Sequence, residues 1–117
     1  MKNYKVKIST SARLDIENLS DFLLTVMSVE GARRYLDTMI AEVYSLEILA
    51  DLYNPSTMVT IRQYHSKARR MVSHNRRWVY IFHIEEENVI VDRIRPSKTA
   101  GEGQAVKDAI FEYLINN

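Results

Sequence analysis

Two consecutive stretches of this chain carry apolar residues three or four positions apart, the spacing that gathers them on one face of an α-helix. The first stretch contains Ala12, Ile16, Leu19, Leu23 and Val26, with Phe22 beside them. The second contains Val29, Ala32, Leu36, Met39, Ile40, Val43 and Leu46. Two amphipathic helices in succession must bury their apolar faces, so the rest of the chain has to supply a surface that they can cover.

Hydroxyl-bearing residues stand where these two helices are expected to begin. Ser9, Thr10 and Ser11 precede the first periodic stretch, and Ser28 precedes the second. A serine at this position can accept a hydrogen bond from a free N–H of the first helical turn. Glu30 falls in the first turn of the second helix, where the helix dipole favours an anion. Both helix starts are therefore predicted.

Alternation of apolar and polar residues, or enrichment in β-branched and aromatic residues, predicts strands elsewhere. The predicted strands cover residues 4–8, 70–74, 77–84 and 89–95, with tight reversals at 74–76 and 85–88 and with Pro96 ending the last strand. Residues 51–66 contain Pro55 and predict a loop with a short strand or turn. Apolar residues at helical spacing after Gly103 predict a short terminal helix at about 104–116.

These elements predict an α+β fold in which two N-terminal amphipathic helices pack on a small antiparallel β-sheet, with a short C-terminal helix. The length of 117 residues suits a single domain, residues 1–117, whose core spans 4–98. Trp78, Tyr80, Phe82 and Ile84 alternate along the longest strand, and we assign them to the core beneath the helices and not to base stacking. The opposite face of that strand, Arg77, Val79, Ile81 and His83, is then a mixed surface where a ligand or partner could bind.

The formal net charge is only +1, but the charges are unevenly distributed. Residues 62–84 contain no acidic residue and six basic ones: Arg62, Lys67, Arg69, Arg70, Arg76 and Arg77. Such a segment attracts phosphates or an acidic partner, although charge also keeps an exposed strand edge soluble. Arg93 and Arg95 alternate on the last strand and would share a face, so the arginines could converge.

Clustered guanidinium groups suit RNA binding or cleavage, because they clamp phosphates and stabilise negative charge on a reacting phosphoryl group. RNA cleavage also needs a side chain that transfers protons, and His74, in the turn beside Arg76 and Arg77, is the best placed of the three histidines. With zero cysteines and no close histidine spacing, no metal or other cofactor is expected. No apolar run approaches the length of a membrane span, so we expect a cytoplasmic protein that does not contact membranes.

The ordered set of motifs resembles the RelE/ParE family of toxins from type II toxin–antitoxin systems, also called plasmid stabilisation proteins, along nearly the whole chain up to Lys98. Residues 4–9 and 12–26 are similar to the family's first strand and helix, and residues 31–49 to its second helix. Residues 69–72 and 75–80 are similar to its sheet core, and residues 85–88 to its acidic hairpin.

The resemblance implies a toxin neutralised by a cognate antitoxin whose extended or helical tail wraps the groove and the basic face. It also implies one of two activities. RelE-like members are mRNA interferases, endoribonucleases that cleave messenger RNA on the ribosome without a metal, whereas ParE-like members poison DNA gyrase and are not enzymes. The expected catalytic residues are Arg77, Arg95 and His74, and the expected RNA-binding residues are Arg69, Arg70, Arg76 and Lys98. Messenger RNA cleavage is the leading expectation, because the basic residues concentrate on the sheet strands. Gyrase inhibition and an inactive interaction module are the alternatives, and a homodimer is possible.

Overall fold

The computed structural model describes residues 2–97, and the long helices lie where the apolar periodicity predicts them. Strand β1 (Lys5–Ile8) leads into α1 (Thr10–Val26), and α2 (Val29–Tyr44) follows directly. The Ser9 hydroxyl oxygen accepts a hydrogen bond from the N–H of Ala12 at 3.1 Å, and that of Ser28 accepts one from Gly31 at 3.0 Å. Both predicted helix starts are therefore confirmed.

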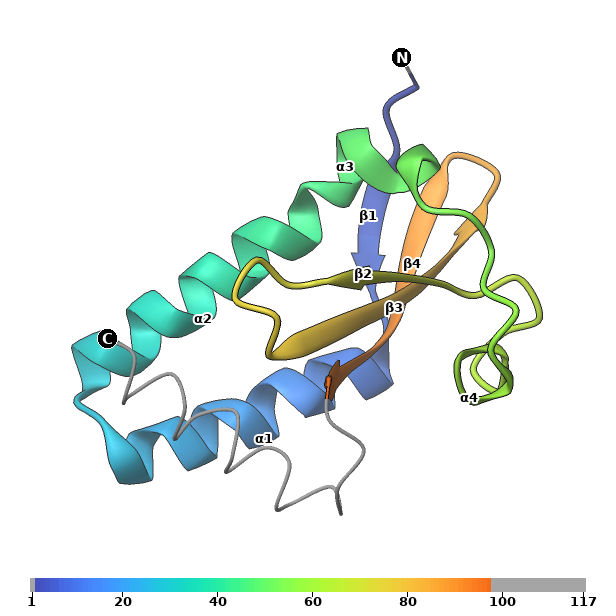
Figure 1. Cartoon of the computed structure of the whole chain (residues 1–117). Helices are drawn as coiled ribbons and strands as arrows, with labels where there is room; N and C mark the ends of the chain where they lie inside the picture. Colours follow the sequence, from blue (N-terminus) through green and yellow to red (C-terminus); the bar gives the residue numbers. More distant parts are fainter. Residues whose placement is uncertain (1, 98–117) are drawn as a thin grey trace.

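A four-stranded sheet in the order β1-β4-β3-β2 contains β2 (Arg69–Val72), β3 (Trp78–Glu85) and β4 (Asn88–Pro96) (Figure 1). Strands β2, β3 and β4 form the predicted antiparallel meander. Strand β1 runs parallel to β4, with Lys5 opposite Asn88, so the sheet is mixed and not wholly antiparallel as expected. An alternating pattern shows which side chains share a face, but it reads the same for either strand direction.

The connection from α2 to β2 is helical in part, where a loop with a short strand or turn was expected. It contains α3 (Leu46–Leu49), the 3₁₀ helix η1 (Ala50–Leu52) and α4 (Val59–Arg62). Four-residue helices are too short to show a period in the sequence, which explains why the pattern did not reveal them. The terminal helix predicted at about 104–116 lies outside the described residues, as does the end of the predicted domain.

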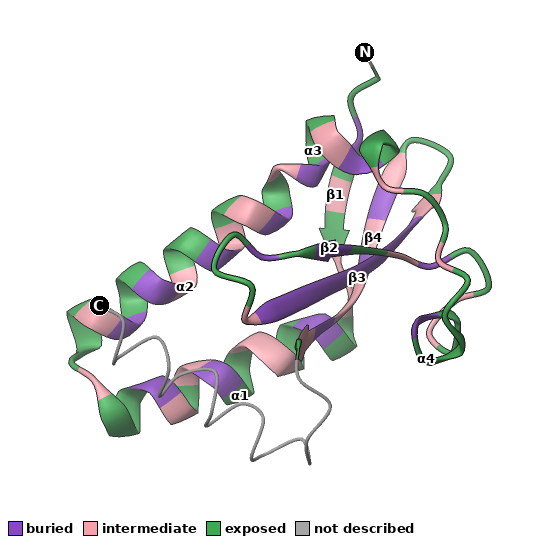
Figure 2. Ribbon diagram, in the orientation of Figure 1, coloured by how far each residue is buried: buried purple, intermediate pink, exposed green. Residues whose placement is uncertain are grey.

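Helices α1 and α2 cover one face of the sheet, which we call the inner face (Figure 2). Trp78, Tyr80 and Phe82 point into this layer and are buried with Leu23 and Val43, which confirms their assignment to the core. A side chain of this size gains about 1.5–3 kcal/mol from full burial, so the β3 stripe makes a large contribution to stability. Ring faces that are fully packed in this way cannot stack on bases.

Val26 and Val29 depart from the predicted apolar face, since they are 41% and 72% exposed. They stand at the junction of α1 and α2, which extends beyond the strands (Figure 1). Periodicity alone does not show where a helix extends past the edge of the sheet that it covers.

One buried hydrogen bond ties the helical layer to the central strand. The Trp78 indole Nε1–H donates to the Tyr35 hydroxyl at 2.7 Å, and both residues are buried. Indole N–H groups in a protein interior need an acceptor, because an unpaired one costs about 1–3 kcal/mol. Tyr35 therefore fixes the position of α2 along β3.

We expect Tyr35→Phe to lower the free energy of unfolding by about 1–2 kcal/mol, because the Trp78 N–H then loses its acceptor. Urea denaturation measures the change. Tyr44→Phe is the matched control, since Tyr44 lies on the same helix and is exposed. Equal stability of the two variants would show that the Tyr35 hydroxyl does not anchor α2.

Candidate functional site

The face of the sheet turned away from α1 and α2, which we call the outer face, carries Arg70, Arg93 and Arg95. The register places Val72, Val79 and Arg95 in one row across β2, β3 and β4, and Arg70, Ile81 and Arg93 in the next row. Paired residues of neighbouring strands point to the same side. Arg93 and Arg95 therefore share a face, as their alternation predicts, and Arg70 joins them.

Part of the outer face is covered by the connection that precedes β2. Ile61 of α4, Ala68 and the partly buried Tyr64 pack against Val79 and Ile81 in a second, smaller core. Figure 1 shows α4 on the opposite side of the sheet from α2. Val79, Ile81 and His83 are therefore buried, and of the four residues predicted to form a mixed binding surface only Arg77 is partly exposed.

Arg93 links the sheet to α1 and so has a structural role. Its guanidinium donates two hydrogen bonds to the Asp15 carboxylate, at 2.8 and 2.9 Å, and the Ile94 N–H donates to the same carboxylate at 2.9 Å. The guanidinium carbon also lies 5.8 Å from the centre of the Tyr64 ring. Two-pronged contacts of this kind hold a guanidinium strongly. The charge of Arg93 is thus compensated inside the protein.

Arg69, expected to bind RNA, lies on the inner side of β2 and away from Arg70. It pairs with Phe82 across the strands, and its Nη1 donates to the Tyr53 carbonyl oxygen at 2.6 Å. Because adjacent residues of a strand point to opposite faces, Arg69 and Arg70 cannot both bind one ligand on the outer face.

The β2–β3 turn brings three further predicted residues together. His74 is exposed, and its N–H donates to the Glu42 carboxylate of α2 at 2.8 Å. Arg76 is exposed with φ 63°, and the carbonyl oxygen of Arg77 accepts a hydrogen bond from the Ser97 N–H at 2.9 Å. Arg77 is partly buried, and Lys98 lies outside the described residues. Five exposed or partly exposed residues lie in the β2–β3 turn or on the nearby part of the outer face. We call them the basic strip: Arg70, Val72, Arg76, Arg77 and Arg95.

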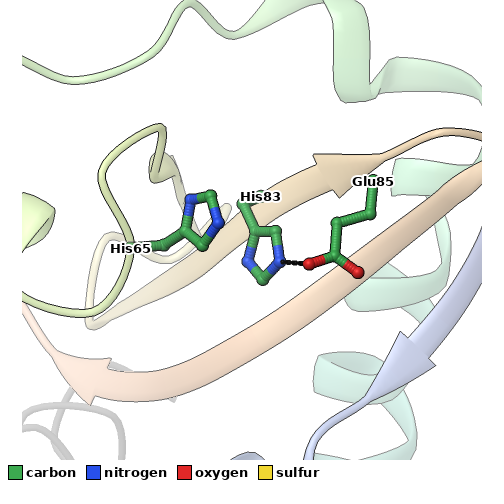
Figure 3. A group of neighbouring side chains, drawn as sticks. All are labelled: His65, His83 and Glu85. Carbon is green, nitrogen blue, oxygen red and sulfur yellow. Dashed lines mark hydrogen bonds and ion pairs between the residues drawn. The ribbon is translucent and has the colours of Figure 1, made fainter.

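A cluster of titratable groups that the sequence did not reveal lies further along the outer face. His83 Nδ1 lies 2.7 Å from Asp92 Oδ2, and its Nε2 lies 3.0 Å from Glu85 Oε1. The His65 ring stacks on the His83 ring, with centroids 3.8 Å apart and planes inclined by 1° (Figure 3). His65, His83 and Glu85 offer ligand atoms that all lie within 4.8 Å of one another, so they could hold a metal ion.

Two effects act in opposite directions on the pKa of the Asp92 carboxyl. Burial raises the pKa of the Asp92 carboxyl, and the hydrogen bond from His83 acts in the opposite direction. An irregularity in the β3–β4 register between Ile81 and Phe82 accompanies this contact, since Arg93 pairs with Ile81 but Val91 pairs with Phe82. Asp92 is the residue left over, and this bulge allows its carboxylate to reach His83.

His83 and Glu85 carried the one available signal for this cluster, because residues two apart on a strand share a face. His65 lies 18 positions earlier and gave none, since only the folding of the 45–68 connection over the sheet brings it to His83. The wide spacing of the histidines along the chain predicted no metal site, but spacing in sequence does not exclude a meeting in space.

A small cavity opens on the inner side, between α2 and the beginning of β3. Its volume is about 50 Å³, and it is lined by Tyr35, Thr38, Met39, Glu42, Asn75, Trp78 and Tyr80. Burial, with the nearby Glu42 charge, raises the pKa of the Tyr80 hydroxyl, which therefore stays protonated. The cavity is far smaller than the roughly 300 Å³ of a typical small-molecule site, so it does not suit a nucleotide.

Within residues 2–97, no helix is long and apolar enough to cross a membrane. No family model matches this chain, and no curated protein sequence matches it. Among solved structures, a chain described as "Chromosomal ParDE TA system from P. aeruginosa" is similar, with a TM-score of 0.67 and 15% sequence identity. The match covers 81% of this chain and 97% of that one, which establishes the shared fold.

We expect Arg93→Ala to lower the free energy of unfolding by about 2 kcal/mol, because it leaves the Asp15 carboxylate without its two charged hydrogen bonds. Arg70→Ala removes the same kind of side chain from an exposed position in the same row and should change stability by less than about 0.5 kcal/mol. Chemical denaturation of both variants tests this division between structural and exposed arginines. A loss in Arg70→Ala as large as that in Arg93→Ala would contradict it.

Proposed function

We propose that this chain is the toxin of a type II toxin–antitoxin pair and that the basic strip binds its target. The observation that carries this proposal is the fold shared with the chain of the ParDE system over 97% of that chain's length. The resemblance of the ordered sequence motifs to RelE/ParE toxins supports it independently, because it rests on the local sequence.

The placement of charges supports a target with negative charge. Residues 62–84 contain basic residues and no acidic ones, and folding presents part of this segment at one end of the outer face. Arg70 and Arg76 are exposed, and Val72 beside them is 43% exposed. Guanidinium groups around an apolar residue suit contact with a phosphate backbone or with an acidic protein surface.

Of the two activities that the resemblance implies, target inhibition without catalysis is the one that the described residues favour. RNA cleavage needs a proton-transfer group within hydrogen-bonding reach of the reacting oxygen. His83 is buried with both ring nitrogens at carboxylates, and His65 stacks on it, so neither of these two histidines is placed for proton transfer. Of the three histidines only His74 is left for that role, and we therefore place a ParE-like inhibitor of DNA gyrase ahead of the ribonuclease.

Messenger RNA cleavage on the ribosome remains the second candidate, and the β2–β3 turn is the observation that favours it. His74 and Arg76 are exposed there, with Arg77 next in sequence. An imidazole for proton transfer and guanidinium groups for phosphate charge are the residue types that metal-free cleavage requires. In this alternative His74 transfers protons, Arg77 stabilises the charge on the reacting phosphate, and Arg95 contacts the RNA backbone.

A cognate antitoxin is the expected partner under either activity. Its tail, if acidic, would complement the basic strip and exclude the target from it. A homodimer, the cytoplasmic location and the role of Lys98 stay predictions from the sequence.

Expression of the full chain in bacteria should stop growth, and the double variant Arg70→Ala/Arg95→Ala should grow, because target affinity depends on the strip. The double variant Arg33→Ala/Arg34→Ala is the matched control, since it removes the same charge from exposed positions on α2. It should remain toxic. Plasmid supercoiling and transcript integrity, measured in the same cultures, distinguish the two activities.

Loss of supercoiling with intact transcripts supports gyrase inhibition, and cleaved transcripts with normal supercoiling support the ribonuclease. Normal growth with the unaltered chain would overturn the toxin proposal and favour an inactive interaction module. Undiminished toxicity of Arg70→Ala/Arg95→Ala would overturn the role of the basic strip.

A further inference from the structure

We infer that His65, His83 and Glu85 form a binding site for a divalent transition-metal ion of the Zn²⁺ type. The ligand atoms of these three residues lie within 4.8 Å of one another, and the site is built from two parts of the chain (Figure 3). His83 and Glu85 project from the outer face of β3, and His65 comes from the connection between α4 and β2. The inference does not depend on the proposed toxin function.

His83 has the surroundings of a metal-binding histidine. Its side chain is only 7% exposed, and its Nδ1 meets the Asp92 carboxylate at 2.7 Å. Histidine ligands usually donate their second ring N–H to a carboxylate, which fixes the tautomer and orients the ring. With the proton on Nδ1, the lone pair of Nε2 faces Glu85 Oε1. Asp92 and Glu85 both offer acceptor oxygens to the ring, and the Nδ1–H tautomer is the one that metal binding through Nε2 requires.

Glu85 supplies a second ligand at a suitable distance. Its Oε1 lies 3.0 Å from His83 Nε2, and its side chain is 61% exposed. Ligands bound at about 2.0–2.1 Å in a tetrahedral site stand roughly 3.3 Å apart, so a small opening of this pair admits an ion. The exposure of Glu85 allows that movement and gives the ion a path from solvent.

His65 must turn to complete the site. Its ring is parallel to that of His83, whereas an ion shared by both has to lie near the plane of each ring. His65 is partly exposed and lies in a short connection, and its Nδ1 accepts a hydrogen bond from the Lys67 N–H at 3.0 Å. Lys67 is exposed, so water can replace this bond if the ring rotates.

The donor set determines the class of ion. Two imidazole nitrogens and one carboxylate suit Zn²⁺, Co²⁺ or Ni²⁺, whereas Mg²⁺ and Ca²⁺ prefer sites made of oxygen alone. Three protein ligands leave a fourth position to water. Bound metal would tie the connection containing His65 to β3, and it would thereby hold the cover over Val79 and Ile81 in place.

A proton is the competing occupant of the cluster. An imidazolium at His83, between Asp92 and Glu85, would also satisfy both ring nitrogens. A metal site and a protonated cluster differ in stability measurements, because only a metal site gains stability when metal is added. They also differ with pH, since acid displaces a metal from histidine ligands.

Isothermal titration of the chelator-treated full chain with ZnCl₂ tests the site. We expect one ion per chain, and we expect His65→Ala and Glu85→Gln each to weaken binding at least about tenfold. Both changes fall on residues that are exposed or partly exposed, so the fold should survive them. His74→Ala is the matched control, because it removes an exposed histidine outside the cluster, and it should bind as the unaltered chain does.

Thermal unfolding gives an independent measurement. Zinc should raise the melting temperature of the unaltered chain and of His74→Ala, and it should not raise that of His65→Ala. The effect of zinc should be smaller at about pH 5.5 than at about pH 7.5, because protons compete with a metal ion for its ligands. No zinc binding at submillimolar concentration, or equal binding by the unaltered chain and His65→Ala, would overturn the inference.

Discussion

Burial of the aromatic stripe of β3 is the interaction on which the rest of the structure depends. Trp78, Tyr80 and Phe82 occupy the inner face of a strand that has neighbours on both sides. Helices α1 and α2 form one layer because their apolar faces pack on this surface, and β3 is central because it pairs with β2 on one side and β4 on the other. The Tyr35–Trp78 hydrogen bond then selects one position for α2, which hydrophobic contact alone does not specify.

Because the stripe points inward, the alternate side chains of β3 point to the outer face. Part of that face is covered by another segment of the chain, and part is exposed. Over Val79 and Ile81 the chain folds the connection that contains α4, because two large apolar side chains in water are unfavourable. At the end of β3 nearer the β2–β3 turn it leaves arginines and Val72 accessible. The same connection carries His65 to His83, so the cover and the titratable cluster have one structural origin.

Arginine has two different roles on these strands, and the difference bears on function. The Arg93 guanidinium pairs with the Asp15 carboxylate and so joins β4 to α1, and Arg69 donates to a backbone carbonyl. A charge that is already compensated adds little to the attraction of a polyanion. The basic surface on the outer face is therefore smaller than the count of basic residues indicates.

Sequence by itself determined both long helices, their serine caps, the antiparallel meander and the inward direction of the aromatic stripe, since periodicity and capping are local properties. The shared outward direction of Arg93 and Arg95 also follows from alternation. Only the tertiary structure decided the parallel pairing of β1, the burial of Val79 and Ile81, the pairing of Arg93 with Asp15, and the meeting of His65 with His83. Each of these joins residues distant in the chain, and a local pattern records which face a side chain occupies but not what that face will meet.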